Sequence, residues 1–97
     1  MDKLWSDKEI EQTAYRFKAV AHPLRLAIVC LLADGERSVG DICEAVGTTQ
    51  PNITQHLLVL HNQKLLKSRK EINRVYYAIN DRRLTEIIGM LQGIYCA

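Results

Sequence analysis

Apolar residues recur at helical spacing near both ends of the chain. Residues 8–21 carry a stripe made of Ile10, Ala14, Phe17 and Ala21. After a helix cap at Asn80 or Asp81, a second stripe is made of Leu84, Ile87, Ile88, Leu91 and Ile94. Each stripe predicts an amphipathic helix, and the two helices open and close the fold.

Two further helices are indicated by residues that start and stop helices. His22-Pro23 ends the first helix because the residue before a proline is pushed out of the helical region, and Pro23 suits the first turn of the next. That second helix, residues 24–33, is nearly all apolar, so we expect it to be buried. Residues 38–41 have the form of a helix cap and open a short third helix that ends at Gly47.

Residues 48–60 predict a fourth helix that divides polar from apolar side chains. Thr48 or Thr49 caps it, and Pro51 fits its first turn. Small polar side chains fill its first two turns, and its apolar anchors to the core are Ile53, Leu57, Leu58 and Leu60. A helix, a glycine-containing turn and this helix form a helix-turn-helix pattern over residues 38–62. The polar end of the fourth helix is suited to a DNA major groove.

After residue 63 the hydrophobic period changes. Residues 65–70 and 74–79 are short, partly β-branched or aromatic, and separated by Glu71-Ile72-Asn73. They predict a β-hairpin, commonly called a wing. The expected fold class is therefore mainly α with a small β-hairpin, a winged helix-turn-helix in one domain over residues 1–97. Because so small a domain buries a limited fraction of its surface, we expect a partner subunit to cover its apolar helical faces.

Positive charge is concentrated in one segment, although the net charge is only +2. Residues 48–83 hold seven basic and two acidic side chains (+5), whereas residues 1–47 hold six and eight (−2) and residues 84–97 hold one acid (−1). The positive segment contains the fourth helix and the hairpin, where DNA phosphates would lie. A merely solvated, lysine-rich hairpin is the alternative interpretation.

The bulk composition restricts the class of protein. A hydrophobic content of 47% and a charged content of 25% are typical of a globular chain. The N-terminus is charged, and no apolar run approaches the roughly 18–20 residues that span a bilayer, so we expect a cytosolic protein with reduced thiols and no membrane contact. We do not expect an enzyme, since no Ser/His/Asp or Cys/His arrangement and no glycine-rich phosphate loop is present.

Candidate DNA-contacting residues come from the fourth helix and the hairpin. On the helix they are Thr48, Thr49, Gln50, Asn52, Thr54, Gln55 and His56. Amide side chains suit the N6/N7 edge of adenine, but helix geometry prevents all of these residues from reaching bases, so some must contact the DNA backbone. On the hairpin, the candidate phosphate or minor-groove contacts are Lys67, Arg69, Lys70 and Arg74. A hydrogen bond inside the fold is the alternative for His56, and we expect His22 and His61 to be structural or solvated.

Four segments carry a family resemblance: Ala21-His-Pro-Leu-Arg-Leu26, Ser38-Val-Gly-Asp-Ile42, Thr49-Gln-Pro-Asn-Ile-Thr-Gln-His-Leu57, and Arg69-Lys followed by Arg74-Val-Tyr-Tyr77. Together they resemble the ArsR/SmtB family of winged-helix repressors, over almost the whole chain. The resemblance implies a homodimer joined through the first and last helices. It also implies binding to an inverted-repeat operator in double-stranded DNA, with release when an inducer binds.

The metal ligands that many members of this family use are missing here. Arsenic-sensing members carry Cys-x-Cys-x-x-Cys in the third helix, where this chain has Ser38, Gly40 and Cys43. A lone thiolate is a poor site for a soft metal. Zinc- and nickel-type members use paired ligands on the last helix, but here Asp81 is followed by Arg83 at a ligand position, and that helix has no histidine. We therefore expect no metal site and no cofactor.

The arrangement of two cysteines resembles that of the persulfide- and redox-responsive branch of the family. Cys30 lies in the second helix and Cys96 at the end of the last. In that branch, two thiols react with reactive sulfur species or oxidants, become linked by a disulfide or short polysulfide bridge, and the dimer releases DNA. A thiolate that attacks sulfane sulfur forms a persulfide, which a second thiol resolves. A small apolar filler is the alternative for Cys30 and the expected role of Cys43.

The leading hypothesis is a dimeric DNA-binding transcriptional regulator, expected to be a repressor, whose operator affinity is controlled through Cys30 and Cys96. Two alternatives stay open. One is a metal- or metalloid-responsive repressor that uses cysteine ligands from both subunits. The other is a winged-helix module that binds protein instead of nucleic acid, against which the positive segment argues.

Overall fold

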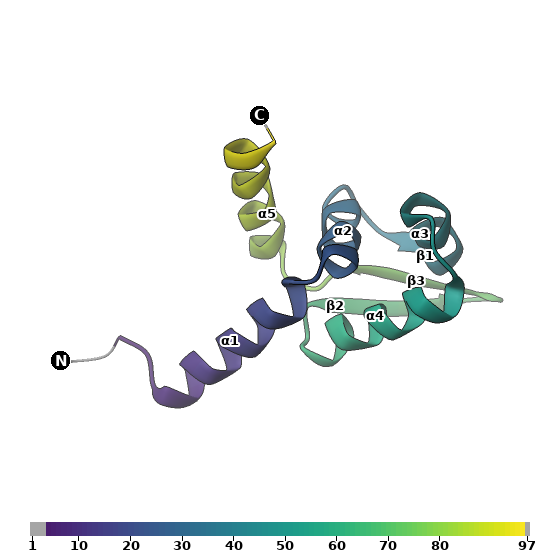
Figure 1. The fold of residues 1–97 in the computed structure, drawn as a ribbon. Helices are drawn as coiled ribbons and strands as arrows, with labels where there is room; N and C mark the ends of the chain where they lie inside the picture. Colours follow the sequence, from purple (N-terminus) through teal and green to yellow (C-terminus); the bar gives the residue numbers. More distant parts are fainter. Residues whose placement is uncertain (1–3, 97) are drawn as a thin grey trace.

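The computed structural model describes residues 4–96 (Figure 1). Their helices are α1 (Asp7–Val20), α2 (Pro23–Leu32), α3 (Val39–Val46), α4 (Gln50–Asn62) and α5 (Arg82–Tyr95). Their strands are β1 (Arg37–Ser38), β2 (Leu66–Glu71) and β3 (Arg74–Ile79). This order confirms the predicted fold class, a mainly α winged helix-turn-helix. Residues 1–3 and 97 of the predicted single domain lie outside the described residues.

The helices begin and end close to the residues that predicted their limits. Ser38 caps α3, which ends at Gly47 in the left-handed conformation, with φ of +79°. Of the two candidate caps for each helix, Thr49 caps α4 and Asp81 caps α5. The two N-terminal helices are separated at residues 21–22, and Pro23 occupies the first turn of α2. The local polar chemistry of the sequence therefore sets the frame of the helix-turn-helix unit.

The hydrophobic core is formed mainly by α2 and α4, with one buried side chain each from α1, α3, β2 and α5. Its buried side chains are Ala19, Ile28, Val29, Leu32, Ile42, Ile53, Leu57, Leu60, Leu66 and Ile88. Three of the four predicted anchors of α4 belong to this set. They fix one face of α4 to α2 and α3 and leave the polar side chains of its first turns on the outside.

A three-stranded antiparallel sheet, in the order β1-β3-β2, supports the helix-turn-helix unit. The β2–β3 hairpin is the predicted wing, but the predicted three-residue break is wrong by one residue. Glu71 pairs with Arg74, which leaves a two-residue turn at Ile72 and Asn73. Strand β1 was not predicted, because two residues paired to Tyr76 and Tyr77 are too short to show an alternating pattern.

Two predictions of burial are wrong in the single chain. Leu58 of α4 is 47% exposed, because it lies on the face of α4 opposite Ile53 and Leu60. The second helix is not buried all round either: Leu26 is exposed and Cys30 is half-buried, since only one face of α2 meets the core. Apolar composition alone does not reveal which face of a helix has a neighbour within the same chain.

Helices α1 and α5 project from the body of the molecule (Figure 1). The described chain is elongated, with principal extents of 52 × 31 × 21 Å. The apolar stripes of these helices are therefore only partly covered: Ile88 is buried, whereas Phe17 and Ile94 are each 66% exposed. Among residues 4–96, no helix combines the length and apolar character that a bilayer crossing requires.

Candidate nucleic-acid interface and thiol pair

The first turns of α4 present a polar outer surface. Gln50, Thr54 and Gln55 are exposed, and with Pro51 and Leu58 they line one shallow depression. These three polar side chains have no hydrogen-bond partner within the described chain, so their donors and acceptors are available to base edges or phosphates. We call Gln50, Thr54 and Gln55 the reading surface.

Other predicted contacts on α4 take part in local hydrogen bonds. Asn52 is half-buried, and its Nδ2 donates to Thr48 Oγ1 at 3.1 Å. The Thr49 hydroxyl accepts from the Asn52 backbone N–H at 3.4 Å and caps the helix. These side chains hold the turn that orients the reading surface.

His56 lies on the inner side of α4, against the start of α2. Its ring centroid is 4.6 Å from that of His22, and its Nδ1 is 3.5 Å from Arg25 Nη1. Burial lowers the pKa of His56, and the charges of His22 and Arg25 lower it further. His22 also caps α2, since its Nδ1 accepts from the Leu24 N–H at 3.1 Å. The surroundings of His56 thus match the alternative of a histidine held inside the fold, and those of His22 match the structural role expected for it.

The basic residues of the hairpin fall into two groups. The side chains of Lys67, Lys70 and Arg74 are exposed and make no ion pair or hydrogen bond with any described residue. Arg69 differs, because its guanidinium is bound by Glu36 and Glu71. The first group makes no ion pair among the described residues, although the charge of Lys67 acts on Glu36. The charge of Arg69, in contrast, is balanced by two carboxylates.

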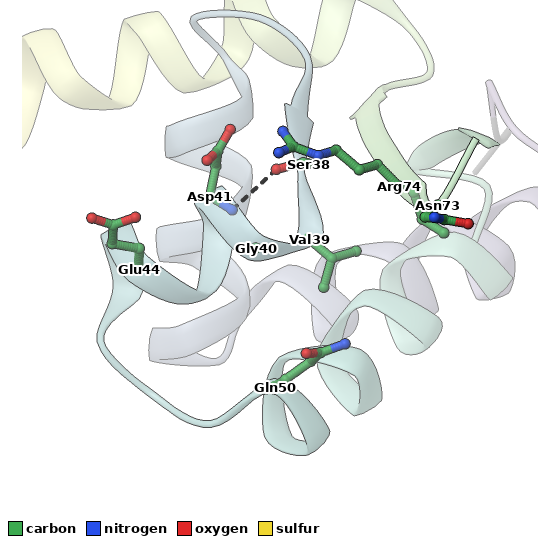
Figure 2. A pocket seen from close by; sticks show the side chains of 9 residues that line it. Ser38, Val39, Gly40, Asp41, Glu44, Gln50, Asn73 and Arg74 are labelled. Atoms are coloured by element: carbon green, nitrogen blue, oxygen red, sulfur yellow. Dashed lines mark hydrogen bonds between the residues drawn. The ribbon is translucent and has the colours of Figure 1, made fainter. Parts of the chain in front are cut away.

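A polar hollow separates the hairpin from the reading helix. Its lining comes from the start of α3, the first turn of α4 and the tip of the hairpin: Ser38, Val39, Gly40, Asp41, Glu44, Gln50, Asn73, Arg74 and Val75. Figure 2 shows the Arg74 side chain extending across this hollow toward Ser38, whose hydroxyl accepts from the Asp41 backbone N–H at 3.1 Å. Gln50 of the reading surface and Arg74 of the hairpin thus flank one concave face.

Cys30 and Cys96 lie close enough to influence each other, although they are far apart in the sequence. Cys30 is half-buried in α2, and Cys96 is exposed at the end of α5. Burial raises the pKa of the Cys30 thiol, and the charge of a Cys96 thiolate raises it further. Cys96 is therefore the more accessible nucleophile and Cys30 the more protected thiol.

The remaining candidate ligands do not converge. Cys43 is half-buried on α3 and packs against the core. Asp81 caps α5 and forms an ion pair with Arg83, with 2.6 Å between Oδ2 and Nη2. Within residues 4–96, no three His, Cys, Asp or Glu side chains form a group that could hold a metal ion.

Three residues of this region make contacts that the sequence did not predict. Arg25 contacts His56, Glu36 binds Arg69, and Tyr76 lies beneath the Arg69 guanidinium. Each contact joins segments that are distant in the sequence or on opposite strands, so it could not be predicted from the spacing of neighbouring residues. Glu36 would have been found only by assuming that a loop acid lies beside the hairpin.

The helix-turn-helix unit, its polar reading surface and the basic hairpin define a winged-helix DNA-binding protein. Comparison with known proteins identifies the particular family. The model of the arsR family of bacterial regulatory proteins matches residues 22–68, and this chain belongs to that family. The resemblance seen in the sequence is thereby confirmed, and the chain is a DNA-binding transcriptional regulator.

Three known proteins illustrate the likeness. The biofilm growth-associated repressor of Xylella fastidiosa is 32% identical over 91 residues, which cover 94% of this chain and 80% of that protein. The transcriptional activator HlyU of Vibrio cholerae is 32% identical over 90 residues, which cover 93% of this chain and 83% of HlyU. Its solved structure superimposes with a TM-score of 0.88 over 95% of this chain and 100% of that one, and another of its structures is described as reduced HlyU.

The third is a possible ArsR-family regulator from Mycobacterium bovis, described as a homodimeric winged helix-turn-helix DNA-binding domain. It is 31% identical, with a TM-score of 0.82 over 96% of this chain and 89% of that one. Relatives of this chain therefore include a protein described as a repressor, one described as an activator and one described as a homodimer.

Proposed function

We propose that this protein is a homodimeric repressor that binds an inverted-repeat operator and releases it when Cys30 and Cys96 are linked. The observation that carries the thiol part is the placement of Cys96, at the end of α5, within electrostatic reach of Cys30 in α2. The protein acts in the cytosol as a binding protein and not as an enzyme.

The apolar stripes of α1 and α5 support the dimer. Phe17, Met90 and Ile94 are each at least 66% exposed in the single chain. Exposed apolar side chains gathered along projecting helices are typical of a surface that another subunit covers. A symmetric dimer would present two reading helices to half-sites about 34 Å apart, one turn of DNA.

The thiol chemistry needs no metal and proceeds in two balanced steps. The Cys96 thiolate attacks the terminal sulfur of a low-molecular-weight persulfide, which forms a Cys96 persulfide and releases the carrier as a thiolate. The Cys30 thiolate then attacks Cys96 Sγ and expels hydrosulfide, which leaves a Cys30–Cys96 disulfide. If further sulfur is added before closure, the bridge is a polysulfide. A bridge between α2 and α5 ties the DNA-reading unit to the dimerisation helix, and this link is the physical basis for coupling.

Intact-mass spectrometry tests the thiol part. We expect glutathione persulfide to remove two alkylatable thiols from the reduced protein, with a product that contains a disulfide or extra sulfur atoms. Peroxide should remove the same two thiols with loss of two hydrogens. For the product of each treatment, peptide mapping should place the bridge between Cys30 and Cys96. A bridge to Cys43, or full alkylation of Cys30 and Cys96 after treatment, would contradict the proposal.

A further inference from the structure

Arg69 is the centre of a polar network that joins the hairpin to the body of the protein. Its Nε and Nη2 donate to the two carboxylate oxygens of Glu36, at 2.9 and 2.7 Å. Its Nη1 donates to Glu71 at 2.5 Å. The guanidinium carbon lies 4.4 Å from the ring centroid of Tyr76, the cross-strand partner of Arg69. Every guanidinium nitrogen therefore has a partner, and one face is stacked.

This network leaves Arg69 poorly suited to neutralise a DNA phosphate. One positive charge faces two carboxylates, so Arg69, Glu36 and Glu71 together carry a net negative charge, and the charge of Lys67 also acts on Glu36. A phosphate would have to displace a bidentate carboxylate, which is among the stronger side-chain interactions. Lys67, Lys70 and Arg74 make no such pair with described residues and can bind phosphate without that cost.

The network sits where the hairpin loses its other support. Strand β1 pairs with β3 only at Tyr76 and Tyr77, so the part of the hairpin beyond Tyr76 has no third strand. Glu36 lies directly before β1, on the loop that follows α2. Its bond to Arg69 thus holds the hairpin to the body at the last supported position before the tip.

We propose that Glu36 and Arg69 are a positioning pair for DNA binding: they fix the hairpin at the angle from which Lys70 and Arg74 reach the phosphates. In this arrangement the acidic side chain of Glu36 strengthens the binding of DNA, although both carry negative charge. This inference rests on the DNA-binding part of the proposed function.

The Glu36→Gln variant distinguishes a positioning role of Glu36 from a purely electrostatic one, because the two roles predict opposite changes in DNA affinity. Charge alone predicts tighter DNA binding, because a negative group near the phosphates is removed. A positioning role predicts DNA binding about fivefold weaker, which corresponds to the free energy that a surface ion-pair network contributes. The probe is a duplex that the reduced wild-type protein selects from a random-sequence pool, with affinity measured by fluorescence anisotropy. Glu44→Gln is the matched control: it removes from the polar hollow an acid that has no ion pair among the described residues, and it should bind as tightly as the wild type or more tightly.

Salt dependence separates positioning from phosphate contact. Arg69→Gln should weaken binding without changing the slope of log affinity against log salt, whereas Lys70→Gln should flatten that slope by about 0.9. The double variant Glu36→Gln/Arg69→Gln should bind no more weakly than either single variant. Hydrogen exchange of the hairpin amides should accelerate in Glu36→Gln while the melting temperature stays close to that of the wild type.

The inference is overturned if Glu36→Gln binds DNA as tightly as the wild type or more tightly, or if Arg69→Gln flattens the salt slope as Lys70→Gln does. A wild-type protein that selects no duplex at all would instead contradict the DNA-binding function on which the inference rests.

Discussion

At the scale of single residues, His56 lies on the reading helix but is held by the body of the fold. Its ring packs against His22 and faces Arg25, whose Nε also donates to the carbonyl of Ala19 at 2.5 Å. A positive charge on protonated His56 would lie beside the guanidinium of Arg25 and the titratable ring of His22. The folded protein therefore favours neutral His56, which makes stability depend on pH.

The direction of that dependence follows from the lowered pKa of His56. The unfolded chain binds a proton near the ordinary value of 6.5, and the folded chain binds it only at lower pH. The free energy of unfolding should therefore fall as pH decreases from about 6.5 toward the pKa of the folded state. Urea unfolding at about pH 7.5 and about pH 5.5 measures this loss, which should be smaller in His56→Gln. An equal loss in both proteins would show that His56 does not contribute.

The thiols of Cys30 and Cys96 should differ in reactivity in the reduced protein. Cys96 is exposed, whereas Cys30 is half-buried with a raised pKa, so iodoacetamide should alkylate Cys96 first. In Cys96→Ser the thiolate that raises the pKa of Cys30 is absent, so the pH profile of Cys30 alkylation should shift to lower pH. Mass spectrometry of timed digests measures both effects. An unchanged Cys30 profile would mean that the two thiols do not lie close together.

At the scale of secondary-structure elements, the sequence predicted what depends on neighbouring residues. The cap at Ser38, the glycine that ends α3 and the proline in the first turn of α4 act locally, so their positions could be inferred. Strand β1 and the Glu36–Arg69 pair depend on contacts between distant segments, and no local pattern revealed them. The same limit applies to Arg69, because its partner Glu36 is distant in the sequence and local pattern alone predicts a phosphate contact.

The hairpin turn also departs from local preference. Ile72 has a φ of +55°, in a region that β-branched side chains rarely adopt, and its side chain is 85% exposed. Ile72→Gly should raise the free energy of unfolding by about 1 kcal/mol, because relief of backbone strain exceeds the entropy that glycine loses on folding. Urea unfolding measures the change. Asn73→Gly, at the neighbouring position without a positive φ, is the control, and an equal or larger gain there would contradict the strain argument.

At the scale of the whole molecule, the sequence predicted the two amphipathic helices but not where their apolar faces would lie. A stripe such as that of α1 is equally compatible with an internal core and with a subunit interface. In the structure, Ala19 and Ile88 enter the core, and the outer parts of both stripes stay exposed. Only the three-dimensional arrangement shows that these outer faces are not covered within the described chain.

The proposed dimer predicts a specific sensitivity to charge on α5. Ile94→Glu should shift the protein from dimer to monomer, because a carboxylate would be desolvated in an apolar interface. Sedimentation velocity measures the oligomeric state. Loss of the dimer should also weaken binding to an inverted repeat. Ile72→Glu places the same charge on an exposed apolar residue of the hairpin and should remain dimeric. If Ile94→Glu also stays a dimer, the interface lies elsewhere.

DNA affinity before and after thiol modification tests the central claim most directly. Reduced protein is titrated against its selected duplex by fluorescence anisotropy, then again after glutathione persulfide. We expect affinity to fall by about 5- to 150-fold, the usual range for allosteric coupling, and to recover with dithiothreitol. Cys43→Ser should respond like the wild type, whereas Cys30→Ser and Cys96→Ser should bind DNA and keep it after treatment. Release from DNA by either of those two variants, to the same extent as the wild type, would contradict the two-thiol mechanism.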